Sequence, residues 1–265
     1  MSRSKETMVG LEQSKGDLLS PREMSEIVLG DPLLCLCLLR QAERNKSHRL
    51  DNETTTALAA IMQLGADGFR SLLLSSPEVD ISNSALLEVE VRATTAARIA
   101  LRWASGHMDL NPEELAVAAL LADAGELLLE VYEPQLPHAA REELQSGRAQ
   151  RSAQAQMQAC GFSFKQLTMR CADLWKLPSL VIQLLHGADS ARARLTRIAS
   201  NAARHLIETS DTSDLALACD VAEAHQLMPS VSLEWLVDEL IMQPEEKRAD
   251  LLRQAELALV QIKKD

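Results

Sequence analysis

Aromatic residues are almost absent from this chain of 265 residues, which has three tryptophans, three phenylalanines and one tyrosine. The hydrophobic core must therefore be built mainly from aliphatic side chains. Glycine and proline are also few, with 10 and 9 copies, although turns between short strands depend on these two residues. No segment of alternating polarity flanked by turn residues stands out. The composition thus argues against a β protein.

Positive charge is scarce as well, because 27 Lys and Arg residues face 38 Asp and Glu residues, for a net charge of −11. Such a surface repels phosphate backbones, so we expect no nucleic-acid partner. No run approaches the ~20 consecutive apolar residues of a membrane-spanning helix, and the N-terminus lacks the apolar core of a signal peptide. The sequence therefore predicts a cytoplasmic globular protein with no membrane span.

Familiar catalytic and metal-binding signatures are missing too. The five cysteines include no CxxC pair, and two of them, Cys35 and Cys37, lie in an apolar run. We expect Cys35, Cys37, Cys160, Cys171 and Cys219 to be buried, reduced thiols, and neither a disulfide nor a zinc site. The six histidines are scattered without ligand spacing, and the GxSxG, P-loop and GxGxxG motifs do not occur.

What the chain does contain is a succession of helical patterns. Apolar residues recur at steps of three and four over residues 84–105 and 191–208, and again within 233–241 and 251–262. The Ala-rich segment 115–129 is apolar on nearly all sides, which predicts one central helix. Ser20-Pro21 and Asn111-Pro112 are typical helix starts. The predicted fold class is all-α.

Polar and turn-forming segments divide the chain. Residues 1–18 are polar and lack periodicity, which predicts a disordered lead-in. The stretch 75–84 is rich in serine and ends an N-terminal helical lobe, predicted over 19–76. A second, larger lobe is predicted over 84–209, so that the domain spans 19–209. We expect the helices of residues 210–265 to pack on this domain.

Five short motifs occur in an order that resembles the HDOD family, a bacterial signalling module related to the HD phosphohydrolases. They are Asp31-Pro32-Leu33-Leu34, Leu38-Leu39-Arg40-Gln41-Ala42, Ala59-Ala60-Ile61-Met62-Gln63-Leu64-Gly65, Leu120-Leu121-Ala122-Asp123-Ala124-Gly125, and Leu174-Trp175-Lys176-Leu177-Pro178 with Leu184-Leu185-His186-Gly187 behind it. The resemblance covers roughly residues 20–210. It implies an HD-like multi-helix domain with a small N-terminal helical lobe.

The resemblance also implies where catalytic relatives hold their metal ions, and this chain departs from the family pattern there. The early His position falls at Arg92, the His-Asp doublet reads Ala122-Asp123, the following pair reads His186-Gly187, and the late Asp reads Asn201. A methyl group, a cation and a neutral amide are poor ligands for a divalent ion. We therefore expect no metal, no cofactor and no catalytic residues.

Other roles for these residues stay open. Arg92, Asp123, His186, Asn201 and His205 could line a remnant pocket. Alternatively, Asp123 makes a structural contact with Arg92, Arg98 or a helix N-terminus, His186 caps a helix, and Asn201 and His205 lie on a solvated flank.

The one dense group of cations on this acidic chain consists of Arg192, Arg194, Arg197 and Arg204. It is either a solvated helix face or a patch for an acidic partner. Binding of a nucleotide or nucleic-acid phosphate is a third reading, although no aromatic residues are interleaved with the patch.

From these observations we expect a catalytically inactive HDOD protein that acts through protein–protein contacts in bacterial signal transduction. The resemblance suggests receiver proteins or cyclic-di-GMP-turnover proteins as partners. One alternative is a sensor that binds a nucleotide or small anion in the degenerate pocket. The other is a residual metal-dependent phosphohydrolase. The sequence does not fix the oligomeric state.

Overall fold

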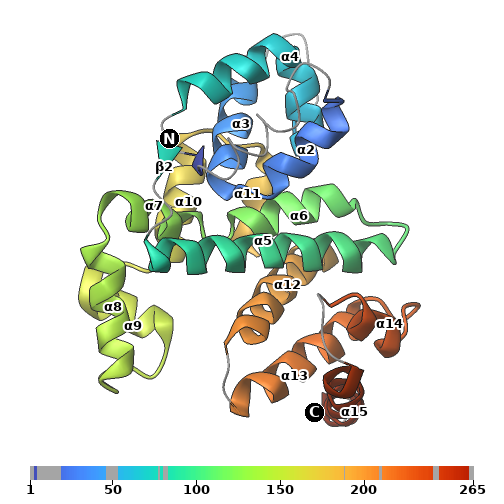
Figure 1. The fold of residues 1–265 in the computed structure, drawn as a ribbon. Coiled ribbons are helices and arrows are strands. Elements are labelled where there is room, and N and C mark those ends of the chain that lie inside the picture. The colour runs from blue at the N-terminus through green and yellow to red at the C-terminus, as the bar shows by residue number, and fades with distance from the viewer. Residues whose placement is uncertain are drawn as a thin grey trace. The chain divides into compact units, whose positions relative to one another are not determined.

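The computed structural model describes residues 3–4, 19–45, 53–76, 78–79, 83–187, 189–208, 211–240 and 245–262. These residues are almost entirely helical (Figure 1), which confirms the all-α prediction. The helices are α2 (Pro21–Leu29), α3 (Pro32–Arg44), α4 (Ala57–Ser75), α5 (Ser84–Ser105), α6 (Pro112–Leu121), α7 (Ala124–Tyr132), α8 (Gln135–Gln145), α9 (Ser152–Cys160), α10 (Phe164–Leu174), α11 (Ser179–His186), α12 (Ala191–Ile207), α13 (Asp211–Leu227), α14 (Leu233–Asp238) and α15 (Glu245–Ile262).

Strand structure in the described chain is confined to two short segments. β1 (Arg3–Ser4) pairs in parallel with β2 (Glu78–Val79). Apart from these two residues of β1, the disordered lead-in predicted over residues 1–18 lies outside the described residues.

Local sequence signals account for many helix starts. Ser20 accepts a hydrogen bond from the backbone N–H of Glu23, whose carboxylate accepts one from the Ser20 N–H, so the predicted start of α2 is a capping box with Pro21 at the first helical position. Asp31 caps α3 in a similar way through the N–H of Leu34. The predicted helix over 84–105 coincides with α5, and the one over 191–208 is α12.

The chain divides into two compact units, each built from two separate segments. Unit 1 comprises residues 1–91 and 120–182, and unit 2 comprises residues 92–119 and 183–265. Helices α5, α6 and α11 have residues in both units. The limits of these units lie inside helices α5, α6 and α11, whereas the predicted boundaries lie at residues 75–84 and 209. The units do not test the predicted domain limits, which stay a prediction.

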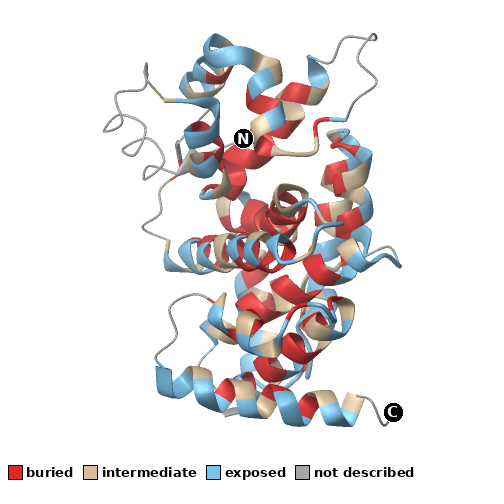
Figure 2. Cartoon of the chain, turned by 90° about the vertical axis from the view of Figure 1, so that its right-hand side faces the viewer, coloured by how far each residue is buried: buried red, intermediate tan, exposed pale blue. Residues whose placement is uncertain are grey.

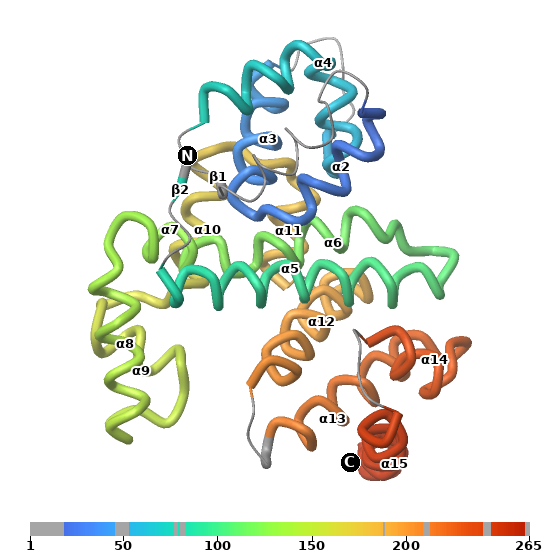
Figure 3. The backbone as a smooth tube through the Cα atoms, viewed as in Figure 1, coloured from blue at the N-terminus to red at the C-terminus, as the bar shows by residue number. Residues whose placement is uncertain are grey.

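In unit 1, helices α2, α3 and α4 pack together as an N-terminal group, which Figure 3 shows as the blue and cyan segments of the tube. A small core joins α3, β2, α5 and α7 through Leu33, Val79, Leu86, Val89 and Leu127. A second small cluster around Phe164 packs α7 and α10 against α8 and α9. These clusters are aliphatic for the most part, as the composition requires.

Unit 2 has the largest apolar cluster described. It joins the C-terminal part of α5 and α6 to α12, α13, α14 and α15. Trp103 is fully buried there, and its indole N–H donates to the carbonyl oxygen of Leu236 at 2.9 Å. In Figure 2, α15, the helix nearest the C mark, has its buried residues on one side. The C-terminal helices are therefore an integral part of the core of unit 2.

The cysteines only partly follow the expectation. All five are free, but only Cys35 and Cys37 are buried, whereas Cys160 and Cys171 are half-buried and Cys219 is exposed on α13. Burial raises the pKa of Cys35, and it raises that of Cys37 to about 11, so both are unreactive thiols. The expectation of burial is wrong for Cys219, because its side chain lies on the outer side of an otherwise well-packed helix.

Helix α4 is unusual because it is apolar but largely exposed to solvent. By length and composition, α4 is the one described helix that could cross a membrane, although core helices of soluble proteins also pass this test. Of the residues in its most apolar window, 22% are buried. Gly65 interrupts its helical geometry with φ 71° and ψ 170°. Met62 and Leu74 are 69% and 73% exposed. This helix therefore presents apolar side chains at the surface of unit 1.

Candidate functional site

Asp123, the remaining acidic residue of the doublet position, lies in a break between helices. The sequence predicted one helix over 115–129, and this is wrong, because α6 ends at Leu121 and α7 begins at Ala124. Asp123 occupies the N-cap position of α7 and is half-buried, although its carboxylate makes no capping hydrogen bond. The positive end of the helix dipole favours a carboxylate at this place.

Thr168 of α10 explains why the chain breaks there. Its hydroxyl accepts a hydrogen bond from the N–H of Gly125 at 2.9 Å and lies 3.4 Å from the carbonyl oxygen of Ala122. The N–H of Gly125, which a continuous helix would pair with the carbonyl oxygen of Leu121, thus finds a buried acceptor on another helix. The Thr168 hydroxyl also lies 3.1 Å from the carbonyl oxygen of Phe164 in its own helix. Sequence reasoning missed Thr168, since nothing in its local pattern identifies the segment it contacts.

The other predicted site residues lie in unit 2. Arg92 is half-buried on α5, and His186 is the exposed last residue of α11. Gly187 follows it with a left-handed φ of 77°, as expected where a helix ends. Asn201 and His205 are half-buried on α12, four residues apart, and the Asn201 Oδ1 accepts a hydrogen bond from Arg204 at 3.4 Å.

His205 forms the best-defined polar contact among these residues. Its Nδ1 lies 2.7 Å from Oδ2 of Asp220 on α13, and the two side chains are 24% and 9% exposed. Burial raises the pKa of Asp220 to about 6, while the hydrogen bond and charge of His205 act in the opposite direction. The solvated flank considered for His205 is thus replaced by a contact between two helices. Asp220 lies outside every motif, so no sequence pattern indicated it.

The predicted pocket residues do not all belong to one unit. Ala122 and Asp123 are in unit 1, whereas Arg92, His186, Gly187, Asn201 and His205 are in unit 2. A pocket lined by residues of both units therefore stays a prediction. Within unit 2, α12 carries both Asn201 and His205, and their side chains are engaged with Arg204 and Asp220.

The residues at the predicted metal positions do not fit a divalent ion. Ala122 has no donor atom, Arg92 is a cation, and the amide oxygen of Asn201 already accepts a hydrogen bond from Arg204. Among the residues that the structure describes, no three His, Cys, Asp or Glu side chains gather as a metal site requires.

The arginines of the predicted basic patch point to separate neighbours. Arg192 lies 3.7 Å from Glu114 of α6, and Arg197 lies 3.9 Å from Glu223 of α13. Arg194 is exposed. The four cations share one helix but do not form one uniform surface, because acidic side chains of unit 2 already lie beside two of them.

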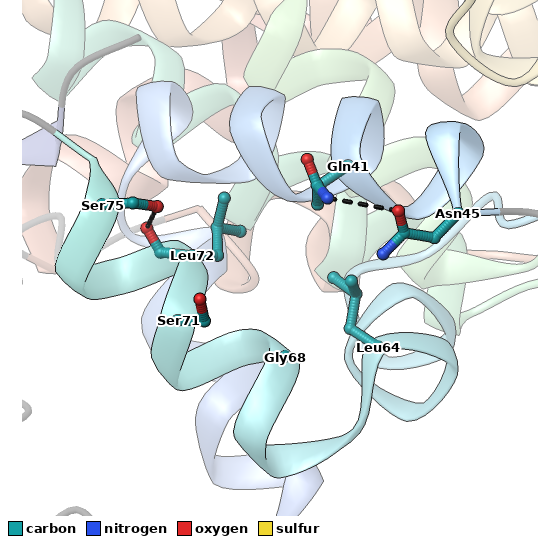
Figure 4. A pocket seen from close by; sticks show the side chains of 7 residues that line it. All are labelled: Gln41, Asn45, Leu64, Gly68, Ser71, Leu72 and Ser75. Atoms are coloured by element: carbon teal, nitrogen blue, oxygen red, sulfur yellow. Dashed lines mark hydrogen bonds between the residues drawn. The ribbon is translucent and has the colours of Figure 1, made fainter.

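A hollow that the sequence did not predict lies between α3 and α4. Figure 4 shows Gln41 and Asn45 on one side and residues of α4 on the other. It has a volume of about 220 Å³, and no charged side chain lines it. On the α3 side, Gln41 donates a hydrogen bond to Asn45 at 3.2 Å. The complete lining is Gln41, Asn45, Leu64, Gly68, Ser71, Leu72 and Ser75.

Two solved structures share this fold over nearly their whole length. The MmoQ response regulator from Methylococcus capsulatus is 19% identical with a TM-score of 0.65, and the match covers 91% of this chain and 98% of that one. A virulence factor from Campylobacter jejuni is 17% identical with a TM-score of 0.69, and the match covers 95% of this chain and 96% of that one. No curated protein matches the chain.

The family assignment comes from the sequence profile of the HDOD domain, which matches residues 12–190. This span includes all five motifs of the predicted resemblance. The chain belongs to the HDOD domain family.

Proposed function

We propose that this protein is a catalytically inactive HDOD protein that regulates bacterial signal transduction through protein–protein contacts. The observation that carries the proposal is the chemistry of the metal positions, where Arg92, Ala122 and Asn201 provide a cation, a methyl group and an amide already bonded to Arg204. An HD-like scaffold with these side chains retains its core and its helix faces, so its function depends on recognition.

Helix α4 supports recognition of another protein and gives it a place. Its exposed Met62 and Leu74 are side chains typical of protein interfaces, and the hollow beside α3 adds uncharged amide and hydroxyl groups. The partner we propose is a receiver protein or a protein of cyclic-di-GMP turnover in the cytoplasm. One solved structure that shares the fold is a response regulator, which is in keeping with such a role.

Absence of hydrolysis is tested first. The purified protein is incubated with Mn²⁺, Fe²⁺ or Mg²⁺ and with cyclic di-GMP or a nitrophenyl phosphodiester, and product and bound metal are measured. We expect no product above the metal-only control and no stoichiometric metal. Metal-dependent turnover that is abolished by Asp123→Ala would show that the protein is a phosphohydrolase and would overturn the proposal.

The α4 surface is tested by affinity capture from the native host with matched variants. Met62→Asp/Leu74→Asp places charges on α4, whereas Leu257→Asp changes an equally exposed leucine, 66% exposed, on α15. We expect a receiver or cyclic-di-GMP-turnover protein to be captured by the wild type and by Leu257→Asp and lost with the α4 variant. Equal capture by all three would place the interface elsewhere.

A nucleotide sensor predicts a different result. It requires a saturable rise in melting temperature with a nucleotide, and this rise should disappear in Arg92→Ala, because Arg92 is the cation of the degenerate pocket. We expect no such rise.

A further inference from the structure

Helix α9 differs from every other described helix in having no ionisable Asp, Glu, Lys, Arg or His residue. The uncharged run extends for 13 residues, from Ser152 to Phe164, in a chain of which 25% is charged. Exposed helix faces of soluble proteins normally carry charge, and interface cores are depleted in it. The absence of charged residues from α9 is therefore unexpected unless the helix is buried or forms an interface.

Burial does not explain this absence. In α9 only Ala155 is fully buried, whereas Gln154, Met157 and Gln158 are exposed, and Met157 is 46% exposed. These three residues lie at steps of three and four, so they form one stripe on the helix. The stripe faces away from α8, against which α9 packs, because Ala155 and Ala159 lie on the inner side. An uncharged stripe is thus left open at the surface of unit 1.

The start of α9 carries a charge of the wrong sign for the helix itself. Arg151 is exposed at the N-cap position and makes no side-chain capping hydrogen bond. A cation at this end opposes the positive pole of the helix dipole and destabilises the helix. It would become favourable if the C-terminal end of another helix, with its unpaired carbonyl groups, lay beside it.

We propose that α9 is the contact helix of a symmetric dimer, in which it packs antiparallel against α9 of a second copy of this chain. Antiparallel pairing places Arg151 of each copy near the negative C-terminal end of the other α9. The exposed stripe then meets itself, as a two-fold axis requires. Met157 supplies apolar contact near the axis.

The amide side chains of the stripe favour a second copy as the occupant. The net charge of −11 opposes self-association over most of the surface, so a contact between two copies has to use an uncharged surface such as this stripe. A glutamine amide is both donor and acceptor, so Gln154 and Gln158 can pair with identical groups across a two-fold axis, whereas a charged residue could not. One helix of 9 residues buries little area, so the dimer is weak and depends on concentration.

The first experiment is sedimentation equilibrium of the full chain between about 1 µM and about 1 mM. We expect the wild type to pass from monomer to dimer in this range. Gln154→Glu/Gln158→Glu should raise the dissociation constant at least about tenfold through like-charge repulsion. Glu at position 154 keeps the oxygen that accepts the N–H of Gln150, so α9 retains its start. Gln183→Glu/Gln226→Glu adds the same charge at exposed positions of α11 and α13 and should leave the constant unchanged.

Charge complementation then locates the contact. An equimolar mixture of Gln154→Glu/Gln158→Glu with Gln158→Lys should form dimers again, because the lysine of one copy meets the glutamates of the other. A wild type that is monomeric throughout the range, or a dimer that the α9 variants do not weaken, would overturn the proposal. A monomeric wild type would mean that α9 binds a different protein, if any. A dimer that the α9 variants do not weaken would place the dimer contact elsewhere.

A last variant separates the dimer contact from a structural role. Arg151→Glu replaces the unfavourable cation by an anion that suits the start of α9, so the melting temperature of the monomer should stay the same or rise. The dimer dissociation constant should rise nonetheless, since the anion faces the carbonyl end of the partner helix. A fall in melting temperature without a change in dimerisation would show that Arg151 acts within its own chain and would overturn its assignment to the interface.

Discussion

Gly125 lets helices α7 and α10 approach closely beside the break that holds Asp123. A Cβ atom at this position would lie 2.8 Å from the backbone nitrogen of Thr168 and 2.9 Å from its hydroxyl oxygen. Because neither the backbone nor a buried hydroxyl can move away easily, we expect Gly125→Ala to lower the free energy of unfolding by about 2 kcal/mol. Urea unfolding followed by circular dichroism measures this change. An unchanged midpoint would mean that α7 and α10 separate without cost.

Asp220 is a residue whose burial has a consequence for pH dependence. Its carboxyl is buried beside His205, with Arg204 and Glu223 as further charged neighbours, and burial raises its pKa from 3.8 to about 6. The folded state therefore holds the proton of Asp220 more tightly than the unfolded state does. The resulting stabilisation is complete below about pH 4 and is lost as the pH rises through about 6.

The variant Asp220→Asn tests this linkage. In the wild type, the unfolding free energy should fall by up to about 3 kcal/mol between pH 4 and pH 7 because Asp220 loses its proton. In Asp220→Asn this fall should be absent. Asp214→Asn, an exposed change on the same helix, should leave the pH profile as it is in the wild type. Urea unfolding at half-unit steps of pH gives the two profiles. A profile of Asp220→Asn that parallels the wild type would show that Asp220 titrates alike in both states.

At the scale of elements, α11 begins without a cap from its own sequence. The residue before Ser179 is Pro178, which has no polar side chain, and the carboxylate of Glu53 takes over this role from 126 residues away. Its two oxygens accept hydrogen bonds from the N–H groups of Ser179 and Leu180 at 3.2 and 3.1 Å. This contact joins the segment before α4 to the start of α11, directly after the Leu174–Pro178 motif, within unit 1.

We expect Glu53→Ala to lower the free energy of unfolding by about 1 kcal/mol, the usual cost of a lost cap, and Glu53→Gln to lower it less, because one amide oxygen can still accept. Glu256→Ala, on the exposed side of α15, is the control and should have no effect. Thermal unfolding of the three variants provides the comparison. Equal melting temperatures for Glu53→Ala and the control would show that solvent caps α11 equally well.

The sequence predicts those elements whose ends are determined by neighbouring residues, and it misses those that depend on contacts with distant residues. The start of α2 at Ser20-Pro21 and the extent of α5 follow from local capping and from periodicity, and both were predicted correctly. The break at Ala122-Asp123 depends on Thr168, and the start of α11 depends on Glu53, neither of which is near in sequence. Single-sequence patterns do not contain such pairings, so they predict one helix over residues 115–129.

The same limit applies to the site at the scale of the whole molecule. The motifs identified the family and the predicted metal-ligand positions, because both depend only on the types and order of residues along the chain. The partner of His205 is Asp220 from α13, beyond the family match that ends at residue 190. The C-terminal region was predicted as helices packed on the domain, and the structure makes α13, α14 and α15 part of the core of unit 2.

This arrangement predicts that the chain does not fold fully without α13, α14 and α15. In a chain that ends at residue 208, Trp103, Leu195 and Ile198 lose the apolar side chains of α13, α14 and α15 that cover them. Trp103 also loses the carbonyl oxygen of Leu236 that accepts its indole N–H. Burial of a large side chain is worth ~2 kcal/mol, so the loss at these three residues alone, about 6 kcal/mol, is comparable to the stability of an ordinary domain.

We therefore expect the truncated chain to be aggregated or to lack near-ultraviolet circular dichroism from its tryptophans, while retaining much of its helix signal. Trp103→Phe in the full-length chain is the milder companion variant. It removes the indole donor and leaves the Leu236 carbonyl without its partner, so it should lower the free energy of unfolding by about 1–3 kcal/mol without loss of cooperativity. A truncated chain that is soluble and unfolds cooperatively at the temperature of the full chain would show that α13, α14 and α15 are an accessory to the fold and not a part of its core.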